Sequence, residues 1–370
     1  MISTGWPDAS NILCVRLDNL GDVLMMTPAM RALKGVMPQR RITLLASDCG
    51  AIVAPHVPEL DDMIAYAAPW MKSSERCDAD SDLAMARVLR QRQFDAAVIF
   101  TSYSQSPLPA AMLCHLADIP LRLAHCHENP YHLLTDWIPD PEPHEHVRHE
   151  VRRQLDLVAA VDARTSDERL SFRVPPEELA WALQRLQAMG IGPAQSWVLL
   201  HPGASAPSRR YPPLQWAEAA DRLAAQTGCA LVFTGSAQES VLVEQIRSAM
   251  TAASHSLAGA LSLGKFGAMI GLAPAIISNN SSPVHLAAAL GTPVVDLYAL
   301  TNPQHTPWQT SSRVLFHDVP CRNCYKSICP QGHHHCLGKV TPARVADSAI
   351  ELLNGEFRLT DRDNQMQSAM

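Results

Sequence analysis

Short, continuously apolar segments alternate with longer amphipathic segments along most of this 370-residue chain. Apolar runs without polar interruption are typical of parallel strands that helices cover on both faces. Strands that alternate with helices indicate parallel, doubly wound sheets. Strands are predicted at 12–17, 42–46, 96–101, 197–202, 230–235, 275–279 and 294–298. Helices are predicted at 22–36, 82–93, 107–117, 147–161, 176–189, 213–227, 237–252, 263–272, 283–290 and 342–354.

The series of strands and helices restarts near Ser196, which predicts two α/β domains that face each other across a cleft. Before the restart, 162–195 is expected to hold a linker and a helix, and the Pro-rich stretch 136–146 is expected to be a loop. We therefore predict a first domain, a second domain, and a terminal helix with a flexible tail. Their expected ranges are 1–175, 176–340 and 341–370.

Composition narrows the class of protein. Apolar residues make up 47% of the chain and charged residues 18%, which is typical of a soluble globular protein. The net charge of −6 and the 5% of aromatic residues indicate neither a basic surface nor a stacking platform for nucleic acid. The start, MISTGWPDAS, predicts no signal peptide, and no apolar run approaches the roughly 20 residues of a membrane span. The expected location is the cytoplasm, where cysteines stay reduced unless they bind metal.

The stretch RLDNLGDVLMMTPAMRAL, from Arg16 onward, places a polar turn where a strand hands over to a helix. In open parallel sheets, ligands bind beyond the carboxyl ends of the strands. Gly21 permits a tight turn, and Asp22 then lies at the helix N-terminus. Asp22 is either a helix cap or a catalytic group, and a cap alone leaves Asp18 and Asn19 without a role. A single glycine does not make a dinucleotide-binding fingerprint.

A second strand–turn–helix stretch, HPGASAPSRRYPPLQW at 201–216, carries hydroxyl and guanidinium groups. Backbone amides with Ser205 and Ser208 could cradle a phosphate, and Arg209 or Arg210 could clamp it. The alternative is an ordinary connecting loop with solvated arginines. The position of the cluster at the carboxyl end of a strand favours the phosphate site.

A third stretch, IISNNSSPVHLAAALGTPVV at 276–295, ends a strand and begins a helix rich in small residues. Ser281 and Ser282 precede a proline that suits the first helical turn, so free amides would point out of the helix end. This arrangement predicts an anion site. By contrast, GALSLGKF at 259–266 lacks the hydroxyl that follows the lysine of a P-loop, and its Ser262 is predicted to cap a helix.

The segment CRNCYKSICPQGHHHC holds four cysteines and three adjacent histidines. A C-x2-C pair with two further thiols suits tetrahedral zinc or iron, and four thiolates would make the site structural rather than catalytic. The alternative is a reduced, packed cluster or a disulfide. The predicted ligands are Cys321, Cys324, Cys329 and Cys336, with His333 or His335 as a substitute.

Three of these stretches, in matching order and spacing, resemble the ADP-heptose glycosyltransferases of glycosyltransferase family nine: RLDNLGDVLMMTPAMRALK, HPGASAPSRRYPPLQWAEAADRL and ISNNSSPVHLAAALGTPVVDLYALTNP. The cysteine segment is similar to the C-terminal segment of many members, and the resemblance covers roughly residues 11–354. It implies the GT-B fold, with two Rossmann-like doubly wound domains and an interdomain cleft. The acceptor would bind the first domain and the nucleotide sugar the second. The last helix would pack back toward the first domain.

The resemblance also implies roles for individual residues. Asp22 matches the catalytic aspartate of the family. The matching donor-side positions are Arg209 and Ser205 for the diphosphate, Ser281 and Ser282 at the start of the diphosphate-binding helix, Asn280 for the sugar, and Glu239 and Leu261 for the nucleoside. The family usually has aspartate where this chain has Asn280 and glycine where it has Ser282, so the contacts to the donor sugar are expected to differ.

The resemblance implies an inverting glycosyltransferase that moves a heptose from ADP-heptose to an acceptor hydroxyl in lipopolysaccharide core synthesis. Asp22 would be the general base, and Arg209 with the helix amides would stabilise the leaving diphosphate without a catalytic metal. The acceptor could instead be a protein or a small molecule. Four basic residues could meet an anionic core sugar or the inner membrane face, and a solvated basic face is the alternative. They are Arg31, Lys34, Arg40 and Arg41.

Three other classes stay open on the sequence. A sugar-nucleotide epimerase of the same fold would consume its substrate without an acceptor. A dehydrogenase would bind a nicotinamide cofactor, and the missing glycine fingerprint argues against it. A non-catalytic homologue would bind the nucleotide without transferring a sugar.

Overall fold

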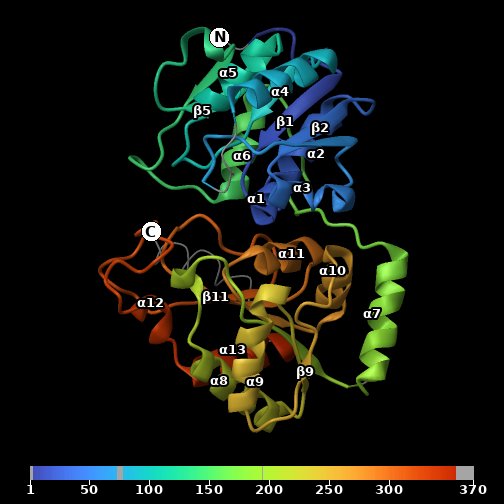
Figure 1. Ribbon diagram of the computed structural model, residues 1–370, viewed down its shortest axis with the longest axis vertical. Helices are drawn as coiled ribbons and strands as arrows, with labels where there is room; N and C mark the ends of the chain where they lie inside the picture. The colour runs from blue at the N-terminus through green and yellow to red at the C-terminus, as the bar shows by residue number, and fades with distance from the viewer. Residues whose placement is uncertain (1–2, 73–77, 194, 356–370) are drawn as a thin grey trace. The chain divides into compact units, whose positions relative to one another are not determined.

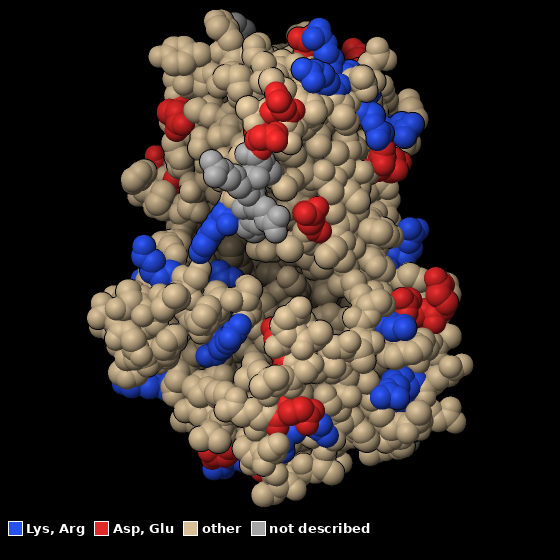
Figure 2. Space-filling model, viewed as in Figure 1, with Lys and Arg blue, Asp and Glu red and all other residues tan. Residues whose placement is uncertain are grey.

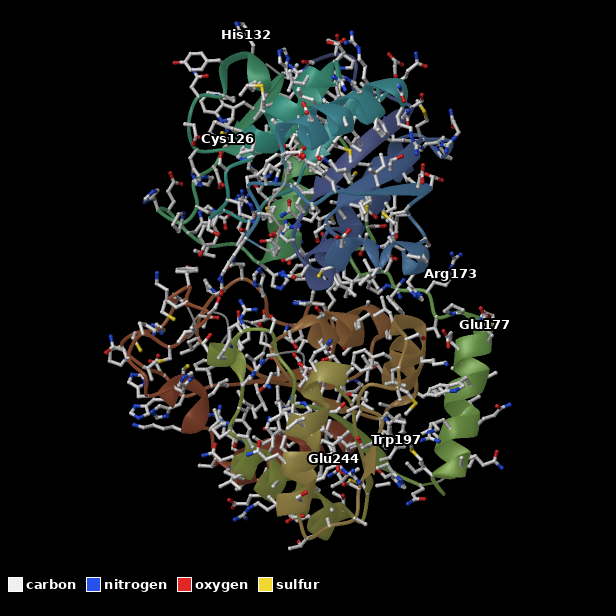
Figure 3. The ribbon with its side chains drawn as sticks, viewed as in Figure 1. Cys126, His132, Arg173, Glu177, Trp197 and Glu244 are labelled. Atoms are coloured by element: carbon white, nitrogen blue, oxygen red, sulfur yellow. The ribbon has the colours of Figure 1, made fainter. Side chains whose placement is uncertain are left out.

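The computed structural model describes residues 3–72, 78–193 and 195–355. The expected flexible tail after the last helix lies outside these ranges. The chain divides into two compact units, residues 1–173 and 174–370. Figure 3 labels Arg173 and Glu177, which lie on either side of this boundary.

The first unit is a parallel sheet with helices on both faces (Figure 1). Its strands are β1 (Asn11–Arg16), β2 (Arg41–Ala46), β3 (Asp62–Ala65), β4 (Ala96–Ile99), β5 (Leu121–Cys126) and β6 (Asp136–Pro139). Its helices are α1 (Leu20–Met25), α2 (Thr27–Val36), α3 (Asp48–Ala51), α4 (Ala79–Gln91), α5 (Leu108–Leu116) and α6 (Glu150–Ala159), with 3₁₀ turns η1 (Ala54–His56) and η2 (Tyr131–Leu133). The strand order β3-β2-β1-β4-β5-β6 puts β1 inside the sheet, and β1 is buried beyond its first residue. Helices α4 and α5 pack with Leu13 and Val15, while α2 and α6 pack together on the other face.

The second unit repeats this architecture with another parallel sheet. Its strands are β7 (Trp197–His201), β8 (Ala230–Phe233), β9 (His255–Ser256), β10 (Ile276–Asn279), β11 (Val294–Leu297) and β12 (Ser312–Leu315). Its helices are α7 (Pro176–Ala188), α8 (Pro213–Thr227), α9 (Ser240–Ala249), α10 (Leu263–Leu272), α11 (Ser282–Leu290), α12 (His335–Gly338) and α13 (Pro342–Leu353), with 3₁₀ turns η3 (Pro207–Arg209) and η4 (Ala237–Glu239). The order β12-β11-β10-β7-β8-β9 places β7 and β10 at the centre, so their carboxyl ends lie side by side. The expected α/β class with two doubly wound sheets is confirmed.

The last helix buries its apolar face in the core of the second unit. Helix α13 packs against α8 within the second unit. Val345, Ala346 and Ala349 are fully buried there, in one core with residues of α8 and the sheet. The expectation that this helix packs back toward the first domain stays a prediction.

Several local predictions also change. The single helix expected at 22–36 is two helices, because α1 ends at Met25 and Pro28 lies in the first turn of α2. The expected loop at 136–146 begins with β6, whose Pro139 is tolerated on an edge strand. Four further strands were not predicted from the sequence, because they are short or carry polar residues: β3, β5, β9 and β12. Within the described part of the chain, no helix has the length and apolar character needed to cross a bilayer.

Candidate active site

The carboxyl end of β1 places a buried arginine among three carboxylates. Arg16 ends the strand, and its side chain is 1% exposed. Its Nε lies 2.8 Å from Asp18 Oδ2, its Nη1 2.7 Å from Glu150 Oε1, and its Nη2 3.2 Å from Asp22 Oδ1. Burial alone would lower the pKa of Arg16, but the three carboxylates raise it overall, so the guanidinium stays charged.

Asp22 has two partners in this cluster. One carboxylate oxygen faces Arg16, and the other accepts a hydrogen bond of 3.1 Å from the backbone N–H of Asn19, the N-cap of α1. The side chain remains 17% exposed. Asp22 therefore serves the helix end and is also oriented by a buried cation, so a capping role does not exclude a chemical one.

A capping role for Asp22 alone left Asp18 without a function, and the structure places Asp18 in the same cluster. Its Oδ1 accepts a hydrogen bond of 2.6 Å from Nε2 of Gln105, and its Oδ2 faces Arg16. Burial raises the pKa of Asp18 and the charge of Asp22 adds to this, which outweighs the lowering by Arg16 and Gln105. The turn thus holds a close pair of carboxylates on one guanidinium.

In the second unit, one buried asparagine ties together the loops that follow β7 and β10. Asn279 ends β10, and its Nδ2 donates to the carbonyl of Pro202 at 2.7 Å. Its Oδ1 accepts from the backbone N–H of Tyr211 at 3.1 Å. The loop 201–211 is therefore fixed beside the start of α11, where the sequence predicted a phosphate site.

The two adjacent arginines of this loop have different partners. Arg209 lies in η3, and its Nη2 donates to Oδ1 of Asn302 at 3.1 Å. Arg210 donates from Nε to the carbonyl of Ala204 in its own loop at 2.8 Å. Ser205 is exposed on the same loop. Arg209 is therefore held by a neutral amide that a ligand can displace. Arg210 instead supports the conformation of its own loop.

Glu239 lies against the backbone of the same loop. Its Oε2 accepts a hydrogen bond of 2.8 Å from the N–H of Ser236 in the capping box of η4. Its carboxylate approaches Gly203 so closely that a Cβ built there would lie 2.1 Å from Oε1. Glycine is therefore required at 203 as long as Glu239 keeps this position.

The remaining donor-side residues of the sequence prediction also belong to the second unit. Ser281 is the N-cap of α11 and Ser282 its first residue. Leu261 is partly buried, directly before Ser262. Ser262 caps α10 by accepting a hydrogen bond from the N–H of Lys265, so the predicted helix cap is confirmed.

Asn280 lies between β10 and α11 and is 5% exposed. Its Nδ2 donates to Oδ2 of Asp296 at 3.0 Å and to the carbonyl of His305 at 3.1 Å. Burial raises the pKa of Asp296 to about 8, although Asn280 and the charge of Arg209 lower it. The amide that stands in place of the family's usual aspartate is thus bonded to a carboxyl on the neighbouring strand.

The cysteine segment does not form the predicted four-thiol site as it stands. Among residues 3–72, 78–193 and 195–355, no three His, Cys, Asp or Glu side chains are grouped to hold a metal ion. Cys321 Sγ lies 3.8 Å from Nε2 of His333. Burial raises the pKa of Cys329, but four backbone hydrogen bonds to its sulfur together lower it below the usual value.

Of the four basic residues expected to face an anionic acceptor, two pair with carboxylates, one is buried, and Arg41 is exposed. Arg40 is 2% exposed and donates to four backbone carbonyls, so its prediction as a surface cation is wrong. Arg31 and Lys34 each have a nitrogen 2.9 Å from a carboxylate oxygen, of Glu59 and Asp61 respectively. In Figure 2, several Lys and Arg side chains of the first unit likewise lie beside acidic ones.

Comparison with known proteins identifies the family of this chain. The sequence pattern of glycosyltransferase family 9 (heptosyltransferase) matches residues 83–335. The chain belongs to this family. It is a glycosyltransferase, and the class expected from the sequence motifs is confirmed.

Full-length similarity supports the assignment. The chain is 25% identical to lipopolysaccharide heptosyltransferase 2 of Salmonella typhimurium over 361 residues, which cover 93% of this chain and 99% of that protein. It shares its fold with a family 9 glycosyltransferase from Veillonella parvula at a TM-score of 0.78 and 21% identity, over 94% of this chain and 98% of that one. The ADP-heptose lipopolysaccharide heptosyltransferase II of Escherichia coli gives a TM-score of 0.72 at 24% identity, over 94% and 99% of the two chains.

This family 9 glycosyltransferase also contains site residues that sequence reasoning missed. Arg16 is the first residue of the first motif, but the sequence of that motif does not indicate that its side chain is buried among carboxylates. Glu150 and Gln105 reach the same cluster from distant segments. Asn279 and Asp296 lie in apolar runs, where an isolated polar residue was the available signal.

Proposed function

We propose that this enzyme transfers a heptose from ADP-heptose to a hydroxyl of an acceptor, with inversion at the anomeric carbon. The observation that carries the proposal is the polar edge of the second sheet. There, the ends of β7, β8 and β10 bring the guanidinium of Arg209, the carboxylate of Glu239 and the start of α11 into one connected set of loops. A guanidinium and a helix N-terminus suit a diphosphate, and a carboxylate suits ribose hydroxyls.

Asp22 is the proposed general base. In the transfer, the acceptor oxygen forms a bond to the anomeric carbon while its proton passes to the Asp22 carboxylate. The bond from the anomeric carbon to the diphosphate breaks, and ADP leaves with the electron pair. Arg209 and the amides at the start of α11 would stabilise the charge of the leaving diphosphate, so no catalytic metal is required. Arg16 orients Asp22 by its Nη2 contact.

The acceptor we propose is the inner core of lipopolysaccharide, and the place of action is the cytoplasm, at the inner membrane face where such an acceptor is held. The support is the similarity over nearly the whole chain to a lipopolysaccharide heptosyltransferase. A glycan on a protein, or a small molecule, is the alternative. A mass-spectrometric assay of ADP-heptose and other nucleotide sugars against these acceptors identifies both substrates.

Replacement of Asp22 by Asn tests the base. The variant keeps the size of the side chain and loses the proton acceptor, so turnover should fall at least about a hundredfold with unchanged ADP affinity. Asp48→Asn is the matched control, because Asp48 is an exposed carboxylate in the first turn of α3. Near-wild-type turnover of Asp22→Asn would refute the assignment, and consumption of ADP-heptose without any acceptor would indicate an epimerase.

A structural metal at the cysteine segment is a second, separate proposal. The chemistry of the donor set fits zinc or iron: four thiols with a histidine beside one of them, and a Cys329 sulfur that backbone N–H groups surround. The apolar cluster beneath the segment is small, with Tyr298, Leu300 and Val319 as its buried members. An ion that draws Cys321, Cys324, Cys329 and Cys336 together would stabilise this part of the second unit.

Metal analysis of the reduced protein tests this site. About one zinc or iron per chain is expected, and Cys324→Ser should lose the ion and lower the unfolding temperature. Cys49→Ser, an exposed cysteine of the first unit, is the control. Metal-free protein with the same unfolding temperature before and after treatment with a chelator would contradict the proposal.

A further inference from the structure

One buried carboxyl of the second unit has no part in the reaction described so far. Asp296 lies in β11, opposite Ser278 of β10, and is 0% exposed. Its Oδ1 has no hydrogen-bond partner among the described residues. A buried carboxyl is costly to keep in a strand unless another group uses it.

The group that uses Asp296 is the amide of Asn280. Both amide hydrogens are taken, one by Oδ2 of Asp296 at 3.0 Å and one by the backbone carbonyl of His305 at 3.1 Å. The carbonyl of His305 can only accept a hydrogen bond, so the amide nitrogen must face it and the orientation of the amide is settled. The carbonyl oxygen of Asn280 is then the only polar atom that its side chain offers to a ligand.

Charge explains why an amide stands at this position. A carboxylate at 280 would lie about 3 Å from that of Asp296, and two carboxylates at such a distance cannot both be ionised. Burial already raises the pKa of Asp296 to about 8, so it is mostly uncharged at neutral pH. Asn280 also directly precedes the N-cap of α11, where a negative side chain would oppose a diphosphate.

We propose that Asp296 is a positioning residue for donor recognition, which holds the Asn280 amide so that only its carbonyl oxygen faces a hydroxyl of the donor sugar. This inference rests on the proposed function and deepens it. Asn280 and Asp296 form a matched pair: a neutral hydrogen-bond acceptor at the site and a buried carboxyl behind it. The pair selects a nucleotide sugar that presents a hydroxyl, not a charged group, next to its diphosphate.

Four variants test the pair: Asp296→Ala, Asp296→Asn, Asn280→Asp, and the double variant Asn280→Asp with Asp296→Asn. The measurements are kcat/KM and KM for ADP-heptose, the Kd of ADP, and the unfolding temperature. Asp296→Ala should lower kcat/KM about tenfold, the loss of about one hydrogen bond, with the Kd of ADP within about twofold of wild type. Asp296→Asn should retain most activity, because an amide oxygen also accepts from Asn280.

The double variant gives the sharper result, because it moves the carboxyl from one strand to the other. Asn280→Asp alone should lower kcat/KM at least about tenfold, because two carboxyl groups about 3 Å apart would have to share one proton. Adding Asp296→Asn should restore most of that loss. An Asp296→Ala variant with wild-type kcat/KM, an equal loss of ADP and ADP-heptose binding, or a double variant no better than Asn280→Asp would each overturn the inference.

The same proteins separate a failure of this inference from a failure of the proposed function. Wild-type enzyme that binds ADP but not ADP-heptose would overturn the proposed donor. In that case the unfolding temperature tests the pairing of Asn280 with Asp296. A higher unfolding temperature for the double variant than for Asn280→Asp supports the pairing, and equal unfolding temperatures contradict it.

Discussion

The two units carry the same kind of sheet but place opposite chemistry at the carboxyl ends of their central strands. At the end of β1, three carboxylates surround the single guanidinium of Arg16, which leaves an excess of negative charge. At the ends of β7 and β10, amides and hydroxyls accompany Arg209, whose partner is the neutral Asn302. The first edge suits the acceptance of a proton and the second suits the binding of an anion. A few residues at strand ends, and not the architecture, set this difference.

The largest effect is expected when the guanidinium of Arg16 is removed from the first edge, and it should appear in the free energy of unfolding. Arg16→Met leaves the carboxylates of Asp18, Asp22 and Glu150 close together without their common partner. The loss of one partner from a buried ion cluster costs about 3–5 kcal/mol of unfolding free energy. Equilibrium unfolding in urea measures the cost. A loss below about 1 kcal/mol would show that the cluster is solvated and that the comparison between the two edges is overstated.

The second edge should respond to the loss of its cation in binding rather than in stability. Arg209→Ala should weaken ADP binding about ten- to a hundredfold, because a charge-assisted bond to the diphosphate is lost. Its unfolding temperature should stay near that of wild type, since the side chain gives up only one hydrogen bond to a neutral amide. Arg210→Ala is the matched control, and its ADP affinity should change much less. Equal losses in the two variants, measured by calorimetry, would contradict the placement of Arg209.

A smaller effect should appear with pH, and in both units. Burial lowers the pKa of His125 in the first unit and of His201 in the second to about 4, from 6.5. The unfolded chain takes up these protons first as the pH falls, so the stability is complete above about pH 6.5 and is lost between there and pH 4. Between pH 7 and 5, each histidine should cost on the order of 1 kcal/mol. His201→Gln should flatten this dependence, measured by unfolding at the two pH values, and an unchanged slope would argue that the ring is hydrated.

Most of the fold could be predicted from the sequence, because parallel strands buried on both faces leave apolar runs that local reading detects. Where the prediction failed, the strands were short or mixed in polarity: β6 carries Asp136 and Pro139, and β9 has two residues. The packing of α13 could not be predicted for another reason. Its apolar face was visible in the sequence, but which of two similar cores it covers depends on tertiary packing.

The candidate site could be predicted in part. Asp22 and the loop with Arg209 and Arg210 stood out because they follow apolar runs at strand ends, and ligands bind there in open sheets. The choice of Arg209 and Asn280 came from the resemblance to the family. Their partners could not be found this way. Glu150 reaches Arg16 across 134 residues, and Asn280 reaches Asp296 from the neighbouring strand, so both contacts depend on sheet order and register.

The contact between Gly203 and Glu239 has a consequence for the descent of this family. A side chain at 203 would occupy the space of the Glu239 carboxylate, so position 203 cannot gain a side chain unless that carboxylate moves or is lost. A lineage that loses the carboxylate releases the glycine, and a lineage that gains a larger residue at 203 has already given up the carboxylate. Glycine at 203 is therefore expected wherever a carboxylate is kept in this position at 239, and the pair would divide related sequences into those that keep this carboxylate and those that do not.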